Sequence, residues 1–137
     1  MASIDDVKLI NFNSFKDHDG LLVPIEQDKN IPFSVKRLYW IFGVKNKKPR
    51  GQHAHYETEQ VFISLKGVCK VSCSDGFTKK DFELTSPFQG LYMPAMIWGE
   101  QIYDENTIVL VLASTFYDRD DYIEDWNSFN NEVDKEK

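Results

Sequence analysis

Two of the three histidines of the 137-residue chain stand two positions apart, in the segment His53-Ala54-His55. If this segment is a β-strand, both imidazoles point to one face and lie about 7 Å apart along it. Two buried imidazoles each need hydrogen-bond partners, so they are poor packing material. The pattern therefore predicts a site where both rings do chemistry, unless the strand turns this face to solvent.

One chemistry open to the pair is metal binding, because His-x-His with a carboxylate can form a facial triad for iron or zinc. Glu59 follows His55 by four residues, and residues 51–67 resemble the first metal-binding motif of the cupins. The second cupin motif adds another histidine after a Gly…Pro stretch, but residues 90–99 contain none. The ligand set is incomplete, so we expect no metal and no other cofactor.

The other chemistry is proton transfer, because a histidine side chain with an ordinary pKa of about 6.5 both takes and gives a proton at neutral pH. Moving a ketone to the neighbouring carbon needs both acts, with an enediol between them. The negative charge that develops on oxygen needs a hydrogen-bond donor. Tyr39 is a candidate donor, provided that strand pairing brings it to the same face as His53.

The elements that position these residues are predicted to be short strands. Apolar runs separated by turn residues cover residues 21–25, 34–44, 60–65, 68–74, 82–84, 90–94 and 107–114. Lys66-Gly67 and Asp75-Gly76 bracket one run and predict a meander of hairpins. The almost wholly apolar run 107–114 predicts a strand buried on both faces. This spacing favours an all-β barrel or jelly roll that can hold one small ligand.

One helix is expected near the end of the chain. Residues 118–123 would begin it, because acidic residues favour a helix N-terminus. Phe129 would anchor this helix to the barrel, and the polar residues 130–137 would fray.

The charge balance restricts the partners. With 16 Lys and Arg against 22 Asp and Glu, the net charge is −6, which argues against binding to nucleic acid or to an anionic membrane surface. An anionic ligand would need a local group of cations. The one dense basic stretch is residues 45–50, which ends at Arg50, directly before the histidine segment.

The length fits one domain, residues 1–137. There is no apolar run of 18 residues and no apolar signal segment at the start, so a cytoplasmic location is expected. Cys69 and Cys73 are then expected to be reduced residues of the core. Their spacing along one strand, about 13 Å, is too long for a disulfide.

Several segments together resemble the bacterial dTDP-sugar 3,4-ketoisomerases, and the resemblance runs over nearly the whole chain. The segments are residues 19–26, 36–40, 49–55, 59–60, 96–98 and 117–123. The most specific is Arg50-Gly51-Gln52-His53-Ala54-His55. The resemblance implies a cupin-type (RmlC-like) jelly-roll barrel with a short C-terminal helix, working without metal as a homodimer that exchanges N-terminal strands.

The implied reaction converts dTDP-4-keto-6-deoxy-D-glucose into a dTDP-3-keto-6-deoxy-D-hexose. The product would feed the synthesis of 3-amino-3,6-dideoxy sugars for lipopolysaccharide, including O-antigen, or for S-layer glycans. Asp19 and Gly99 depart from the family pattern where the face of protonation at C4 is thought to be set. The galacto product is slightly favoured over the gluco product.

The resemblance also implies residue roles. His53 would be the principal acid/base, His55 a second acid/base or an orienting group, and Tyr39 a hydroxyl partner of the sugar. Substrate binding is expected from four further residues, of which the arginines would neutralise the diphosphate: Arg37, Arg50, Gln52 and Trp98.

Three other functions stay open at this stage. A dTDP-4-keto-sugar 3,5-epimerase shares the barrel and also uses a histidine and a tyrosine, typically in a longer chain. A non-catalytic sugar-nucleotide binding module would bind dTDP without turnover. A metal-dependent cupin dioxygenase would need the ligand set that residues 90–99 do not complete.

Overall fold

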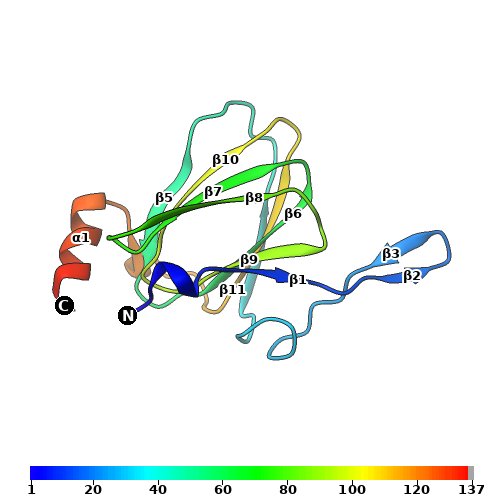
Figure 1. Ribbon diagram of the computed structural model, residues 1–137, viewed down its shortest axis with the longest axis horizontal. Helices are drawn as coiled ribbons and strands as arrows, with labels where there is room; N and C mark the ends of the chain where they lie inside the picture. Colours follow the sequence, from blue (N-terminus) through cyan, green and yellow to red (C-terminus); the bar gives the residue numbers. More distant parts are fainter. Residues whose placement is uncertain (136–137) are drawn as a thin grey trace.

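Two five-stranded antiparallel sheets pack face to face in the computed structural model, which describes residues 1–135 (Figure 1). The first sheet contains, in spatial order, β1 (Lys8–Asn11), β9 (Gln89–Met93), β6 (Gln60–Lys66), β11 (Ile108–Ala113) and β4 (Arg37–Ile41). The second contains β12 (Tyr122–Ile123), β5 (Arg50–His55), β10 (Trp98–Tyr103), β7 (Cys69–Ser74) and β8 (Lys79–Leu84). A separate hairpin, β2 (Phe15–Asp17) with β3 (Gly20–Leu22), projects away from both.

Alternation of apolar and polar residues places the main core between the sheets. On β7, Cys69, Val71 and Cys73 are buried there, whereas Lys70 points to solvent. Both cysteines are free thiols in this core, as the sequence predicts. Strands of the opposite sheet close the core from the other side with Phe62 and other buried side chains.

The order of pairing differs from the predicted meander. β7 and β8 do form a hairpin, but β6 pairs with β9 and β11 while β7 pairs with β10 and β8. The turn at Gly67, with φ +80°, therefore carries the chain from one sheet to the other. The prediction was wrong because alternation fixes which side of a strand is buried but not which strand lies beside it.

Two smaller apolar clusters cover the outer faces of the sheets. Residues 23–35 pack Ile31 and Phe33 against Val61 and Leu112 on the first sheet. The outer side of β11 is covered only in part, because Ile108 is half-buried, so the prediction of burial on both faces holds for part of the strand.

The second sheet is covered by α1 (Trp126–Lys135), whose Phe129 and Val133 pack on Ala54 and Trp98. No helix within residues 1–135 is long and apolar enough to cross a membrane. The expected all-β jelly roll with one short C-terminal helix is confirmed.

The predicted start of the helix was wrong. Residues 119–121 form a 3-10 turn capped by the Asp118 side chain, which accepts a hydrogen bond from the Asp120 amide at 2.9 Å. Tyr122 and Ile123 then add to the edge of β5 as β12. The acidic residues cap a single turn because the β-branched and aromatic pair that follows favours a strand.

The predicted fraying of residues 130–137 was also wrong over the residues that the structure describes. α1 continues to Lys135, because Val133 is buried against the sheet. Residues 136–137 lie outside the described part of the chain.

Phe129→Ala is expected to destabilise the fold by about 3–5 kcal/mol, because it empties a fully buried aromatic position. Urea denaturation measures this loss. Asn131→Ala, at an exposed position of the same helix, should stay within about 0.5 kcal/mol of the parent. A loss below about 1 kcal/mol for Phe129→Ala would contradict the assigned anchoring of α1.

Candidate active site

β5 presents both histidines to the interior of the barrel, because Ala54 between them points outward into the cluster under α1. The two rings lie perpendicular to each other with centroids 5.0 Å apart. His55 is only 4% exposed, and His53 is half-buried. The structure thus brings the two imidazoles into contact on one face.

A β-bulge fixes the orientation of His53. Gly99 on β10 lies opposite His53 while Glu100 lies opposite Gly51, so Gln52 is an extra residue in β5. Gly51 and Gln52 have φ of +84° and +50°, which turns the Gly51 carbonyl toward the His53 ring. Nδ1 of His53 donates to this carbonyl at 2.9 Å, which leaves Nε2 as the ring nitrogen for chemistry.

Gly51 is required at the bulge for two reasons. Its φ of +84° is in the left-handed region, where a side chain adds strain. A Cβ atom there would also lie 2.5 Å from Oε1 of the buried Gln101. Gly51 therefore allows the backbone conformation that orients the His53 ring.

Asp121 fixes the second ring. Nδ1 of His55 donates to Asp121 Oδ2 at 3.0 Å. The same carboxylate accepts hydrogen bonds from the backbone amides of Glu57 at 2.8 Å and Thr58 at 3.3 Å, and from the Thr58 hydroxyl. This arrangement places the proton of neutral His55 on Nδ1 and leaves Nε2 as an acceptor.

Both members of this pair, His55 and Asp121, favour their deprotonated forms. Burial, together with the nearby His53, lowers the pKa of His55 to about 4, although Asp121 opposes the shift. Burial alone would raise the pKa of Asp121, but hydrogen bonds from Thr58 and Glu57 and the neighbouring His55 outweigh it and lower the pKa. At neutral pH the site therefore holds a neutral imidazole beside a carboxylate.

Tyr39 enters the same interior from β4. Its hydroxyl oxygen accepts a hydrogen bond from Gln60 Nε2 at 3.1 Å, so the phenol proton is left to donate. Burial raises the pKa of Tyr39 to about 12, with the nearby Tyr122 adding to the effect. The phenol is therefore protonated at neutral pH.

Arg37 lies two residues before Tyr39 on β4 and contacts the C-terminal segment through Tyr117. Its guanidinium lies 5.7 Å from the ring centroids of both Tyr39 and Tyr117. Tyr117 in turn lies 6.0 Å from Tyr122, whose ring packs on both imidazoles. The positive charge of Arg37 also helps to lower the pKa of His55.

Three polar atoms in the interior are buried and have no hydrogen-bond partner within residues 1–135: Arg37 Nε, His55 Nε2 and Tyr103 Oη. Buried polar groups in proteins are nearly always paired. Three such atoms from β4, β5 and β10 therefore indicate an interior built to hold a polar ligand.

Comparison with known proteins places this arrangement in a family. Residues 5–134 match the family described as "FdtA: WxcM-like, C-terminal". The chain belongs to this family. A curated relative, TDP-4-oxo-6-deoxy-alpha-D-glucose-3,4-oxoisomerase of Aneurinibacillus thermoaerophilus, is 43% identical over 129 residues, 93% of this chain and 93% of its own.

Solved structures agree with the FdtA assignment. QdtA, a sugar 3,4-ketoisomerase of Thermoanaerobacterium thermosaccharolyticum in complex with TDP, has a TM-score of 0.92 at 37% identity, over 97% of this chain and 98% of that chain. A 3,4-ketoisomerase of Helicobacter canadensis has a TM-score of 0.91 at 39% identity, over 94% and 98%. The expected cupin-type fold and the resemblance to dTDP-sugar 3,4-ketoisomerases are confirmed, and the protein is an isomerase of this family.

Three further residues were expected in the site. Arg50 and Gln52 are exposed at the start of β5. Trp98 points to the outer face of its sheet, where it packs on Trp126 and Phe129, because its neighbour Gly99 is the residue that faces His53. Trp98 therefore lies on the other side of the sheet from the two histidines.

Glu59, the carboxylate considered as a metal ligand, also lies apart from the histidines. It accepts a hydrogen bond from the Tyr92 hydroxyl at 2.5 Å. Within residues 1–135, no group of three His, Cys, Asp or Glu side chains is placed to hold a metal ion.

Sequence reasoning missed the contribution of the C-terminal segment. The Tyr122 ring lies 5.1 Å from His53 and 4.4 Å from His55, centroid to centroid, and Tyr117 lies 6.0 Å from Tyr122. Asp121 was assigned to a helix start. The matching family segment at residues 117–123 was the available signal, but it carried no indication of which side chains reach the histidines.

Stability is expected to fall as the pH drops from about 6.5 to 4. Unfolded chains bind a proton at the ordinary histidine pKa of 6.5, whereas folded His55 binds one only near 4, so folding is opposed within this window. The contribution of neutral His55 to the free energy of unfolding is complete above pH 6.5. At most about 3 kcal/mol of that free energy is lost as the pH falls. Urea denaturation across this pH range measures it.

His55→Asn should flatten the pH dependence in this window. His18→Asn is the matched control, because the His18 side chain is 96% exposed and its removal should leave the slope as in the parent. An unchanged slope in His55→Asn would show that His55 is not the group responsible.

Proposed function

We propose that the chain is a sugar 3,4-ketoisomerase that converts dTDP-4-keto-6-deoxy-D-glucose into a dTDP-3-keto-6-deoxy-D-hexose by proton transfer through an enediol. One observation carries the proposal: two imidazoles lie in contact, each with Nδ1 bound by the protein and Nε2 left for substrate, and a protonated phenol enters the same interior. The name of the curated relative supports this substrate and this reaction.

His53 is the base in this proposal. Its Nε2 takes the proton from C3, and the electrons move through C3–C4 to leave an enediolate with its charge on O4. Tyr39 donates a proton to O4, because its phenol is protonated and Gln60 already occupies one lone pair of its oxygen. The enediol that results carries hydroxyls at C3 and C4.

The second half of the reaction returns a proton to carbon. The O3–H proton passes to Nε2 of His55, and Asp121 stabilises the imidazolium that forms for that moment. As the C3 ketone forms, C4 takes the proton held by His53, and the proton on His55 returns to Tyr39. Overall, one proton moves from C3 to C4 and one from O3 to O4, so His53, His55 and Tyr39 all end as they began.

The two arginines are proposed to bind different parts of the substrate. Arg37 would bind the sugar, which is supported by its buried Nε that has no partner within residues 1–135. Arg50 and the basic segment 45–50 would bind the diphosphate, because two or more cations can meet its charge. Gln52 at the bulge would contact the substrate between them.

The configuration of the product at C4 is proposed to be galacto, as the sequence slightly favours. Gly99 faces His53 directly across the strands and contributes no side chain there. We further propose that the 3-keto product is the acceptor for an amino group in the synthesis of 3-amino-3,6-dideoxy sugars of surface glycans.

Incubation with dTDP-4-keto-6-deoxyglucose in deuterated buffer, followed by NMR, tests the reaction. The expected product has its ketone at C3 with EDTA present, and deuterium enters C4 when the proton on His53 exchanges with solvent before it is returned. A small H4–H5 coupling in undeuterated buffer identifies the galacto product, and a large one the gluco product. A ketone that stays at C4 with inversion at C3 and C5 would instead identify an epimerase.

His53→Asn should lower kcat by about 10²- to 10⁴-fold, the usual contribution of a positioned acid or base. TDP binding, measured by calorimetry, should be kept, because the change removes only the proton-transfer group. No 3-keto product from the parent enzyme, with EDTA or with added metal, would refute the function, and a near-normal rate in His53→Asn would remove this residue from the role of base.

We also propose a homodimer that exchanges N-terminal strands. The β2–β3 hairpin reaches away from the barrel (Figure 1) and exposes Phe15, Leu21 and Leu22, which have no apolar surface to cover within one chain. The outer face of β4 exposes further large apolar side chains: Leu38, Trp40 and Phe42. A second copy of the chain would bury both surfaces.

Sedimentation equilibrium should find a dimer for the parent chain. Trp40→Glu should shift the equilibrium toward monomer, because a charge on the apolar face of β4 opposes its burial. Phe77→Glu, at an exposed aromatic near α1 on the other sheet, should remain dimeric. A monomeric parent chain would refute the proposal.

A further inference from the structure

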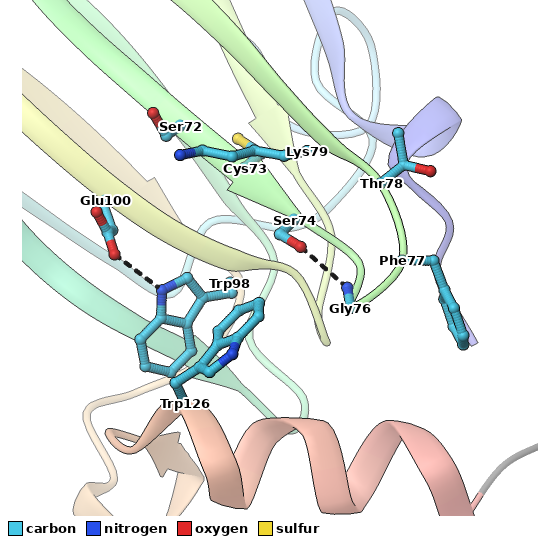
Figure 2. A pocket seen from close by; sticks show the side chains of 10 residues that line it. All are labelled: Ser72, Cys73, Ser74, Gly76, Phe77, Thr78, Lys79, Trp98, Glu100 and Trp126. Carbon is cyan, nitrogen blue, oxygen red and sulfur yellow. Dashed lines mark hydrogen bonds between the residues drawn. The ribbon is translucent and has the colours of Figure 1, made fainter.

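A cavity of about 380 Å³ opens on the outer face of the second sheet, between β7, β8, β10 and the start of α1 (Figure 2). It is separate from the interior site, because Trp98 and Glu100 line it while Gly99 between them faces His53 on the other side of the sheet. The volume falls in the range of small-molecule sites, about 300–1,000 Å³.

The strand register assembles the polar side chains of this cavity. Ser74 lies opposite Trp98 on one side and Lys79 on the other, so these three form a row across the sheet. Ser72 lies opposite Glu100 in the next row on the same face. Side chains from three strands therefore converge on one space, as Figure 2 shows.

Two tryptophans form the apolar wall. The ring of Trp98 is nearly buried and stands perpendicular to that of Trp126, with centroids 5.3 Å apart. Trp126 is 41% exposed, so its indole presents an open surface at the edge of the cavity. Trp98 Nε1 donates to Glu100 Oε1 at 3.3 Å, which holds the carboxylate over the indoles.

The charges of the cavity select the class of ligand. Lys79 and Glu100 both line it, and neither forms an ion pair with another side chain of residues 1–135. One ammonium and one carboxylate leave the cavity with no net charge, and Glu100 would repel a phosphate. A neutral ligand that both donates and accepts hydrogen bonds satisfies the pair and the two serine hydroxyls together.

We propose that this cavity binds a pyranose ring of a neutral saccharide. The C–H face of the ring packs on the exposed indole of Trp126, and ring hydroxyls donate to Glu100 and accept from Lys79. The Ser72 hydroxyl can either donate a hydrogen bond to the ring hydroxyls or accept one from them. The interior site binds the nucleotide-linked sugar on the opposite side of the same strands, so the two sites are independent.

NMR of the ¹⁵N-labelled full chain tests the proposal through its three tryptophan indoles. Titration with methyl β-D-glucopyranoside or methyl β-D-galactopyranoside should shift the Trp98 and Trp126 indole signals and leave that of Trp40 in place. Saturation is expected with a Kd in the millimolar range, on the order of 1 mM, as for ligands of this size. Saturating TDP should leave the titration unchanged.

Two variants assign the contacts. Glu100→Gln keeps the shape of the side chain but removes the carboxylate, and Trp126→Ala removes the indole wall; each should weaken binding at least tenfold. Lys80→Ala is the matched control, because Lys80 is on the same strand as Lys79 but does not line the cavity. It should bind as the parent does.

Four outcomes would overturn the proposal: no shift of the Trp98 and Trp126 signals with either glycoside, equal shifts with inorganic pyrophosphate, loss of the shifts when TDP is added, and unchanged affinity in both cavity variants. If the parent chain shows no isomerase activity, only the proposed function is contradicted, because the glycoside titration does not depend on turnover.

Discussion

The carboxylate of Asp121 is the group on which the arrangement of the site depends. It receives hydrogen bonds from the His55 ring, from two backbone amides of the loop after β5, and from the Thr58 hydroxyl. These contacts join a segment near the end of the chain to the strand that carries both histidines. β12 is only two residues long and could hardly stay in place through its own ladder. Because Asp121 holds it, the Tyr122 ring can pack on both imidazoles.

The same strand serves two purposes through the alternation of its side chains. His53 and His55 point inward, and Ala54 between them packs under α1. The bulge at Gly51 then breaks the regular ladder where the orientation of one ring matters. The structure thus combines a rigid, buried second ring with a first ring oriented by its own backbone. The two imidazoles thus differ in burial and in the group that orients each of them.

The sequence predicted the part of the site that depends on local geometry. The pair His53 and His55 shares a face because period two is a property of any strand, and Tyr39 reaches the same interior on β4. It did not predict Asp121 or Tyr122, since contacts 66 positions apart depend on strand order. It gave no face for Trp98, because a shift of a single residue decides which face a side chain takes. The predicted meander failed for a related reason, because turn residues mark a change of direction but not the sheet that follows.

The dependence of His55 on a carboxylate near the C-terminus has a consequence for biosynthesis. Ribosomes make β4 and β5 before the segment that fixes the second imidazole and before the helix that covers Ala54. A nascent barrel therefore carries an unsupported imidazole until residues 118–135 have been made. The orientation of His55 is thus set by residues made more than sixty positions after it, and not when its own strand leaves the ribosome.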